Sequence, residues 1–442
     1  MRSRLRIWAG VVAVAAVTGA LVAPAAAQSG TKPTDTEVGV SASEIHLAVI
    51  ADVDNALAPG LFKGAEVGAQ AAARYLNSKA GGGGVGGRKL VIDFYDSKLT
   101  PNDARNGVIK ACQNDLALVG TSALFLTTVD DMVGCADKAG KPVGIPDIGG
   151  VVTGIPEACS PMSFPVIGSQ IDCATITQNP QTYYGNQGQG KYLLRTHKGG
   201  LHGAFVIASD TKDANRGGAV LAKASQAAGI KADQEVTKSG RDPQSAYTGL
   251  VQQMKTDNSN YAQITLSGNS AIEFRDEAQL QGLSNDVVWY GTFYHDATFQ
   301  KNLTAADGFY VGVAYLPFEE AKYNAMLRNF LKYVGLENAD QFAVYAWSAT
   351  ITFAQAARGV VDKDGVNGLT RSSLIAGIKG LTDFDAGGMI GTHSFKTAKP
   401  TSCFIMTQVS SGKWKRLWPK KAGTFDCKPS NFVELKADLI GR

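Results

Sequence analysis

The stretch KLVIDFYDSKLTPNDARNGVIKAC, residues 89–112, predicts a β-strand followed directly by an α-helix. Its first eight residues are rich in the aliphatic, β-branched and aromatic side chains that strands favour. Thr100 then stands at a helix N-cap position, Pro101 at the first helical position and Asp103 in the place of the capping-box acid. Alanine and valine residues recur at helical spacing after them, which completes a β–α unit.

The flanking segments repeat this alternation. Strands are predicted at 44–53, 116–120 and 141–146, and helices at 60–79 and 127–140. Strands that alternate with helices at this spacing predict a parallel sheet covered by helices on both faces.

A second array of the same kind begins at residue 202, after a segment at 150–190 that lacks strong periodicity. Its predicted strands are 202–209, 231–236, 261–267, 286–291 and 308–315, and its helices lie near 214–228, 244–256 and 270–281. Two arrays of similar pitch predict an α/β fold of two similar doubly wound parallel-sheet lobes.

The remaining chain does not form a third array. It contains predicted helices at 323–335, 342–361 and 371–381, and a closing hairpin at 403–418. Because these helices have no strands of their own, we expect them to cover the sheets that already exist, with the chain crossing between the lobes more than once.

The glycine-rich segment GGGGVGG at 81–87 satisfies the spacing G-x-G-x-x-G of a dinucleotide loop. In a dinucleotide site, however, the glycines follow a strand and open a helix, whose N-terminus binds the pyrophosphate. Here they follow a predicted helix and precede a strand. We therefore predict a helix C-terminus and a turn, and no phosphate site.

Charge and motifs disfavour several function classes. The net charge of +4 over 442 residues, without a basic stripe, disfavours nucleic acid as a partner. The histidines are dispersed without paired spacing, so no zinc site is expected. They are His46, His197, His202, His295 and His393. No nucleophile motif or calcium loop is present either, so we expect neither catalysis nor a cofactor.

The N-terminus has the pattern of a secretory signal peptide over residues 1–27. A basic start is followed by an apolar run and by small residues suited to cleavage after Ala27. The alternative is a retained membrane anchor, which the short run, rich in alanine and broken by Pro24, disfavours. No cysteine follows the run, so we expect an exported, soluble protein of the periplasm or cell exterior without a lipid anchor.

The chain has six cysteines, and in an exported protein an even count indicates disulfides. Many pairings are possible. The expected one joins nearest neighbours and closes short loops: Cys112–Cys135, Cys159–Cys173 and Cys403–Cys427. The alternative is that all six are buried free thiols.

The predicted sheets suggest a ligand site between them. In open parallel sheets ligands bind beyond the carboxyl ends of the strands, so two facing sheets would form a cleft lined by strand-end loops. Small residues there let backbone donors approach a ligand, and aromatic residues supply apolar walls. The candidate binding residues are Asn55, Ser122, Leu124, Phe125, Asp147, Ile148, Gly149, Asp213, Ser267, Asn269, Phe293 and Tyr294. The alternative for each loop is an ordinary β–α turn.

Five segments follow one another in a characteristic order and spacing. They are EIHLAVIADV (44–53), GGVGGRKLVIDFYDSKLTPNDARNGVIKAC (83–112), LALVGTSALFLTTVDDMVGCADKAGKPVGIP (116–146), AADGFYVGVAYLP (305–317) and IGTHSFKTAKPTSCFIMTQVSSGKWKRL (390–417). In this series, over residues 43–427, the chain resembles the type I periplasmic solute-binding proteins of ABC transporters, in the branched-chain amino-acid and amide group.

The resemblance implies a two-lobed clamp that closes on a small-molecule ligand and is then recognised by a membrane permease. It implies a three-strand hinge, with crossovers near 165–172, 314–320 and 392–400. Lobe 1 would comprise 43–168 plus 318–394, and lobe 2 would comprise 169–317 plus 395–430. A first-lobe disulfide is common in the family and is consistent with Cys112–Cys135. We expect a monomer, since one clamp suffices.

The resemblance also bears on the ligand. Family members hold an amino-acid carboxylate with hydroxyl side chains and backbone N–H groups, at positions that fall here around 122–125 and 147–150. They usually hold the ammonium with an acid shortly after a strand-end glycine. After Gly291 this chain has Asp296 two or three places late. An uncompensated ammonium would be costly in a closed cleft, so we expect a more apolar or aromatic ligand, as a carboxylate or amide. The alternatives to a solute-binding protein are an exported α/β hydrolase and a free ligand sensor.

Overall fold

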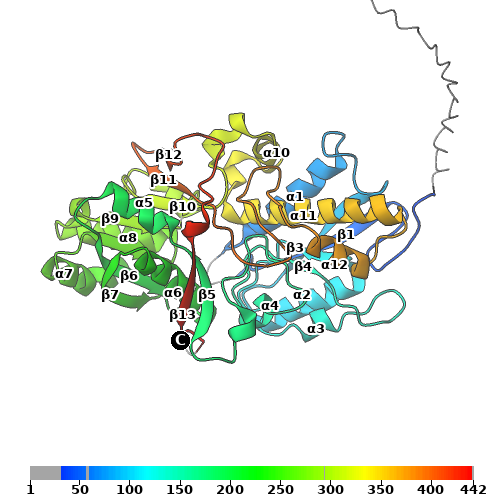
Figure 1. Cartoon of the computed structure of the whole chain (residues 1–442), viewed down its shortest axis with the longest axis horizontal. Helices are drawn as coiled ribbons and strands as arrows, with labels where there is room; N and C mark the ends of the chain where they lie inside the picture. Colours follow the sequence, from blue (N-terminus) through cyan, green and yellow to red (C-terminus); the bar gives the residue numbers. More distant parts are fainter. Residues whose placement is uncertain (1–30, 56–58, 293, 441–442) are drawn as a thin grey trace, which may run out of the picture.

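The structure is a computed structural model that describes residues 31–55, 59–292 and 294–440 (Figure 1). The predicted signal peptide at 1–27 and the candidate residue Phe293 lie outside the described residues. The described part is an α/β protein with two main sheets, each flanked by helices, as the sequence predicted, and a third sheet of two strands.

The first sheet has four parallel strands in the order β2-β1-β3-β4. They are β1 (Glu44–Ala51), β2 (Lys89–Asp96), β3 (Ala117–Val119) and β4 (Asp147–Ile148), connected by α1 (Lys63–Asn77), α2 (Pro101–Asn114) and the short α3 (Asp130–Val133). The β–α unit at 89–112 is confirmed: the Thr100 side chain accepts a hydrogen bond of 3.1 Å from the Asp103 N–H and caps α2.

The second sheet has seven strands in the order β12-β11-β10-β9-β8-β6-β7, and β6 to β10 are parallel. Its strands are β6 (His202–Ala208), β7 (Lys231–Lys238), β8 (Tyr261–Ile264), β9 (Val288–Gly291), β10 (Tyr310–Val313), β11 (Ile405–Val409) and β12 (Trp414–Trp418). The accompanying helices are α5 (Gly188–Thr196), α6 (Lys212–Ala227), α7 (Thr248–Thr256), α8 (Gly268–Leu280) and α9 (Ala297–Lys301). The predicted closing hairpin is confirmed as β11 and β12, which add antiparallel to β10.

Three late helices pack on the first unit, which confirms that they join an existing sheet: the longest contacts β3 and β4, and the other two pack against helices that cover the sheet. They are α10 (Ala325–Val334), α11 (Gln341–Asp364) and α12 (Arg371–Lys379). The long α11 lies beside α1 (Figure 1), and its Trp347 is completely buried. The indole of Trp347 stacks on Tyr75 of α1, with ring centroids 5.4 Å apart.

Two predicted elements were wrong in extent. The helix expected at 127–140 is confined to Asp130–Val133, because Gly134 and the disulfide-bonded Cys135 follow. The strand expected at 141–146 is displaced to Asp147–Ile148. Pro142 and Pro146 lack the N–H group that a ladder needs, so regular pairing with β3 begins only after them.

One sheet was missed. The strands β5 (Gln181–Asn186) and β13 (Phe432–Ala437) form an antiparallel ribbon of their own, which packs on α6. Because β5 pairs with a strand some 250 residues away rather than with a neighbour, the local sequence around 150–190 does not predict this sheet.

The chain passes between the two sheets three times, after β4, after β10 and after α12. These crossing segments are hydrogen-bonded to one another. Ser169 N–H donates to the Ala398 carbonyl at 2.8 Å, and Gly391 N–H donates to the Ala314 carbonyl at 2.7 Å. The third segment therefore lies against both others, at the predicted crossovers, as a three-strand hinge does.

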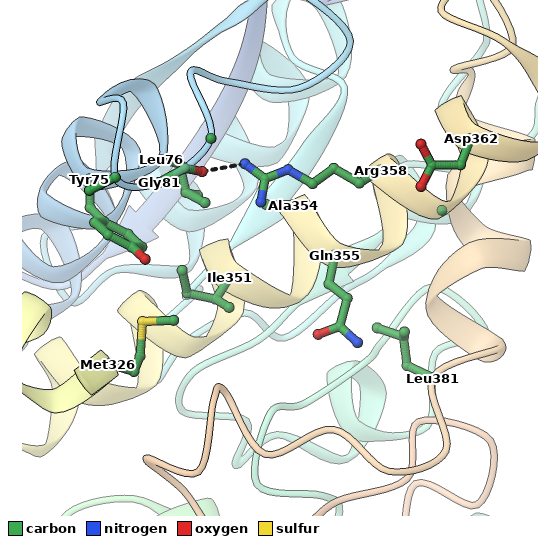
Figure 2. A pocket seen from close by; sticks show the side chains of 13 residues that line it. Tyr75, Leu76, Gly81, Met326, Ile351, Ala354, Gln355, Arg358, Asp362 and Leu381 are labelled. Carbon is green, nitrogen blue, oxygen red and sulfur yellow. Dashed lines mark hydrogen bonds between the residues drawn. The ribbon is translucent and has the colours of Figure 1, made fainter. Parts of the chain in front are cut away.

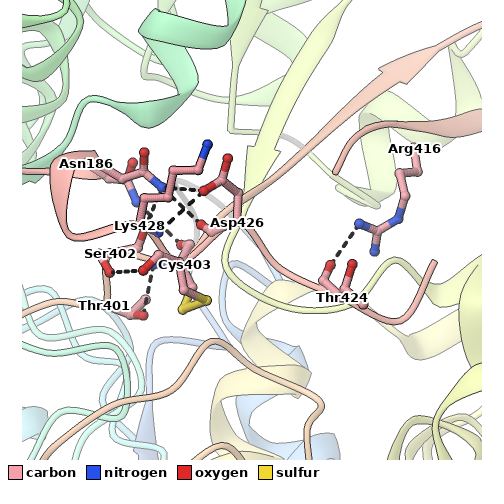
Figure 3. Close-up of a disulfide and its surroundings, with 10 residues drawn as sticks. Asn186, Thr401, Ser402, Cys403, Arg416, Thr424, Asp426 and Lys428 are labelled. Carbon is pink, nitrogen blue, oxygen red and sulfur yellow. Dashed lines mark hydrogen bonds between the residues drawn. A yellow bond between two sulfur atoms is a disulfide. The ribbon is translucent and has the colours of Figure 1, made fainter. Parts of the chain in front are cut away.

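The nearest-neighbour disulfides are confirmed. Cys112–Cys135, Cys159–Cys173 and Cys403–Cys427 have S–S distances of 2.08, 2.05 and 2.08 Å. The last one joins the third crossing segment to the chain that leads into β13 (Figure 3). Hydrogen bonds reinforce this link, since Ser402 Oγ donates to the Cys427 carbonyl at 3.2 Å.

The glycine-rich segment ends a helix and turns into a strand, as predicted. α1 ends at Asn77, and the Gly84 N–H donates to the Leu76 carbonyl at 2.8 Å. Arg358 of α11 donates hydrogen bonds to the carbonyls of Gly81 and Gly84, beside a surface cavity of about 680 Å³ (Figure 2). Carbonyl groups that face a guanidinium present the opposite polarity to the N–H cradle of a phosphate loop.

Glycine allows α1 and α11 to approach closely. Substitution by alanine should therefore destabilise the protein at a glycine in this contact, but not at a glycine of α11 that faces open space. A Cβ added at Gly68 would lie 2.3 Å from the Ala343 carbonyl oxygen, so Gly68→Ala should lower the free energy of unfolding by about 1–3 kcal/mol. Gly359 on α11 has nothing within 4 Å of an added Cβ, so Gly359→Ala should be neutral or stabilise by up to about 1 kcal/mol. Denaturant-induced unfolding of both variants checks this, and equal effects would contradict the packing.

Candidate functional site

The carboxyl ends of the parallel strands form one edge of each sheet. In the first sheet β3 lies between β1 and β4, and in the second sheet β8 lies between β9 and β6. The loop after β3, at 120–125, and the loop after β8, at 265–269, therefore occupy the middle of their edges. The remaining strand-end loops flank them on either side.

At one flank, the loop after β4 meets the start of α6. The Arg216 guanidinium donates to the Thr153 carbonyl, and a Cβ at Gly154 would lie 3.6 Å from Asp213 Oδ2. The residues enclose a cavity of only about 30 Å³, room for little more than one or two waters. Here the two units are in contact.

At the other flank, the start of α1 faces the loop after β9 across a cavity of about 450 Å³. This volume lies in the range of small-molecule sites. The cavity is lined by residues of both units: Gly60, Lys63, Gly64, Val67, His295, Gln300, Lys301, Leu336, Glu337, Asn338, Ala339 and Asp340. A contact on one flank and a cavity lined by both units on the other show that the two strand-end edges face each other.

Asp52, the residue after β1, organises the first wall of this cleft. Its completely buried carboxylate accepts hydrogen bonds from Ser97 Oγ at 2.6 Å, from Leu99 N–H at 2.8 Å and from Leu124 N–H at 2.8 Å. One side chain thus joins the loops that follow β1, β2 and β3. Asp52 was not among the predicted site residues, although an acid that directly ends an apolar strand was a visible signal.

Two more buried acids lie at the first strand end and beyond it: Asp147 is the first residue of β4, and Glu157 lies in the short helix α4 (Ile155–Ala158) that follows. Asp147 is completely buried and its Oδ1 accepts from Thr121 Oγ1 at 2.7 Å, while neither oxygen of the buried Glu157 has a hydrogen-bond partner among the described residues. Burial raises the pKa of Asp147 to about 6. Burial, followed by the neighbouring charges of Asp147 and Asp213, raises the pKa of Glu157 well above its ordinary value.

A buried cation at the same flank is already paired. Arg216 is buried and its Nη2 contacts Asp213 Oδ1 at 2.5 Å within the first turn of α6. Arg216 therefore pairs with Asp213 on its own helix and also links that helix to the Thr153 carbonyl of the facing unit. The sequence analysis singled out Asp213 but missed Arg216.

The predicted first-wall residues have different environments. Asn55, Leu124 and Phe125 are half-buried in their loops, whereas Ser122, Asp147, Ile148 and Gly149 are buried. Ser122 Oγ donates to the Gly120 carbonyl at 3.0 Å, and Ile148 belongs to the hydrophobic core. In this conformation the half-buried residues have side chains that a ligand could reach, while the buried residues hold the loops in place.

The predicted second-wall residues also divide. Ser267 caps α8 by accepting from the Ser270 N–H at 3.2 Å, and Asn269 is exposed in the first turn of that helix. Tyr294, expected as an apolar wall, is 1% exposed. Its hydroxyl donates to Glu319 Oε2 at 2.6 Å and accepts from the Phe318 N–H at 2.7 Å. It packs inside an aromatic cluster next to the second crossing segment, while its neighbour His295 lines the larger cavity.

Within the described part of the chain, no helix combines the length and apolar character needed to cross a membrane.

Two α/β units that face each other across a cleft and are joined by three crossing segments define the class of bilobal ligand-binding proteins. The family model described as periplasmic binding protein matches residues 44–413. The chain therefore belongs to the periplasmic binding protein family, as the resemblance indicated.

Solved structures agree in fold. A fatty acid ABC transporter substrate-binding protein from Thermomonospora curvata matches with a TM-score of 0.63 and 16% identity, covering 89% of this chain and 98% of that chain. A solute-binding protein of an ABC transporter from R. palustris, in complex with benzoate, gives 0.62 and 18%, covering 85% and 96%. A leucine binding protein from Thermotoga maritima gives 0.58 and 13%, covering 84% and 97%. A search of curated proteins gave no match.

The buried acids predict a characteristic pH dependence. An acid whose pKa is higher in the folded than in the unfolded protein holds a proton that unfolding releases, so its contribution to stability falls as pH rises. Glu157→Gln removes that cost and should raise the free energy of unfolding at pH 8 by at least about 1 kcal/mol, with a smaller gain at pH 5. Chemical denaturation at both pH values measures this difference.

The same substitution at Glu320 is the matched contrast. Glu320 and Arg416 are both 8% exposed, and Arg416 Nη2 donates to Glu320 Oε2 at 2.7 Å. Glu320→Gln leaves a buried guanidinium without its counter-ion and should destabilise by about 3–5 kcal/mol. If both variants changed stability in the same direction at pH 8, the distinction between a paired and an unpaired buried acid would be wrong.

Proposed function

We propose that this protein is an extracytoplasmic solute-binding protein that captures a small organic acid or amide with an apolar or aromatic body and delivers it to an ABC importer. The single observation that carries the proposal is the cavity of about 450 Å³ lined by both units. A ligand there would contact both walls at once and would favour the closed arrangement by its higher affinity for it.

The hinge supports this mechanism. Three crossing segments that are hydrogen-bonded side by side can bend together while each sheet stays rigid. The contact of Arg216 with the Thr153 carbonyl would then belong to the closed state and would break on opening. The lobe boundaries that we propose remain 43–168 plus 318–394 and 169–317 plus 395–430.

The charges along the second wall support an acid or amide rather than an amino acid. Asp213 is paired with Arg216, and Asp296 Oδ1 accepts from the Phe299 N–H at 2.9 Å. Both acids are thus engaged, and a ligand ammonium would compete for them. The cavity of about 450 Å³ has Lys63, which pairs with Glu66, and Lys301 on opposite walls, and its lining includes the apolar Val67 and Leu336. Its two acids are Glu337 and Asp340, and Asp340 is engaged as the N-cap of α11.

The names of similar structures support the same class. One is a fatty acid substrate-binding protein and one is a complex with benzoate, so two proteins of this fold take organic acids. The leucine binding protein supports an amino acid as the second candidate ligand. The family supports a small-molecule partner and a membrane permease, and we further propose a monomer that is exported after removal of residues 1–27, without a lipid anchor.

A thermal-shift panel tests the ligand class. The panel contains benzoate, medium-chain fatty acids, aromatic and aliphatic amides, and leucine. A ligand at 100 times its dissociation constant adds about 2.7 kcal/mol, so an acid or amide that binds should raise the melting temperature visibly. A response to leucine alone would contradict the ligand class but keep the solute-binding function. The absence of any response would contradict both and favour an enzyme or a free sensor.

The contact between the units predicts a ligand-affinity effect. Arg216→Gln removes the charged donor to the Thr153 carbonyl, and the best acid of the panel should bind about tenfold more weakly. Arg105→Gln is the control, because Arg105 pairs with Asp131 on the first unit alone and its side chain is 59% exposed. Titration calorimetry measures both affinities. Equal affinities of the two variants would contradict a role of Arg216 in closure.

A further inference from the structure

Three side chains that could hold a metal meet in the first sheet, at the end away from the cleft. They are His46 near the start of β1, Asp93 in the middle of β2 and Asp115 just before β3. One ligand atom from each lies within 4.8 Å of the others, and His46 Nδ1 is 2.7 Å from Asp93 Oδ2. Neither the cleft nor the hinge uses these residues.

Asp115 is the unusual member of the group. It is completely buried, and its Oδ2 accepts a hydrogen bond of 3.1 Å from the Tyr95 hydroxyl. Its Oδ1 has no hydrogen-bond partner within the described chain. The Arg371 guanidinium lies close, but the hydrogen bonds it donates among the described residues go to backbone carbonyls, including that of Asp115 itself.

The second unit contains the same arrangement without the extra acid. His202 near the start of β6 contacts Asp233 of β7, with Nδ1 and Oδ2 again 2.7 Å apart. The residue that takes the place of Asp115 there is Ser259, because Asn260 N–H donates to the His202 carbonyl just as Leu116 N–H donates to the His46 carbonyl, both at 2.9 Å.

Ser259 completes its site without an ion. Its hydroxyl donates to Asp233 Oδ2 at 2.5 Å, so the carboxylate of the second unit is satisfied by neutral and imidazole partners. In the first unit a carboxylate replaces this hydroxyl. The replacement brings a second negative group to the histidine and leaves a buried oxygen unpartnered, and a bound cation would satisfy both.

We propose that His46, Asp93 and Asp115 form a binding site for one divalent transition-metal ion of the zinc class. One imidazole and two carboxylates suit zinc, cobalt and nickel better than calcium or magnesium, which prefer oxygen ligands alone. His46 and Asp93 have side chains that are 34% and 33% exposed, so an ion has access and both can open to admit it between them. The ion would join β1, β2 and the start of β3.

The sequence could not indicate this site, because its ligands are separated by 47 and 22 positions and follow no zinc motif. They meet because β2 and β3 pair with β1 on its two sides. The expectation that no zinc site exists rested on spacing along the chain, which does not measure proximity across a parallel sheet.

Metal titration of the full, untagged protein after treatment with a chelator tests the proposal. Zn²⁺ is followed by calorimetry, Co²⁺ by its visible absorption, and Ca²⁺ serves as the comparison ion. We expect one equivalent of Zn²⁺ or Co²⁺ to bind, and Asp115→Ser, which copies the second unit, to weaken binding at least tenfold. His202→Gln is the matched control and should bind like the unaltered protein.

The outcomes are decisive in either direction. No stoichiometric binding, preference for Ca²⁺, or unchanged affinity in Asp115→Ser would overturn the proposal, and so would a loss confined to His202→Gln. If Asp115→Ser does not fold, His46→Gln replaces it, because the half-buried His46 side chain can be changed without leaving a cavity in the core. A tenfold or greater loss in His46→Gln supports the site, and unchanged affinity overturns it.

Discussion

The hydrogen bonds to the Asp52 carboxylate are the interaction on which the cleft depends. They connect the loops after β1, β2 and β3 through a completely buried carboxylate, so the strand ends of the first unit form one rigid wall. A rigid wall is what a clamp requires, because a ligand can draw two units together only if neither yields locally. The backbone passes between the two main sheets in the three crossing segments, and we infer that these supply the compliance that the wall lacks.

The sequence predicted those elements and disulfides that are determined by residues close together in the chain. The strand and capped helix at 89–112 follow from residues that are adjacent in the chain, and the nearest-neighbour disulfides follow from short loops. The ribbon of β5 and β13 was missed because its partners are far apart in sequence. The helix at 127–140 was overestimated because the glycine and the disulfide-bonded cysteine that end it carry no helical pattern of their own.

The site was predicted less completely for a similar reason. The loops that the sequence indicated do follow strands of the two sheets, but burial decides what each side chain does there. Tyr294 looks like a cleft aromatic in sequence and is an interior residue that holds Glu319, whereas Arg216 looks like a surface helix residue and is buried at the contact between the units. The two lobes are alike in that each has a histidine paired with an aspartate, His46 with Asp93 and His202 with Asp233. They differ in the residue beside this pair, which is Asp115 in the first unit and Ser259 in the second.

The central claim is that ligand binds between the two units and contacts both. A crystal structure with the tightest-binding organic acid tests it most directly. We expect density for the acid in the cavity between the start of α1 and the loop after β9, in contact with residues of both lobes. Density confined to one lobe, for example in the cavity of about 680 Å³ beside Arg358, would contradict this claim.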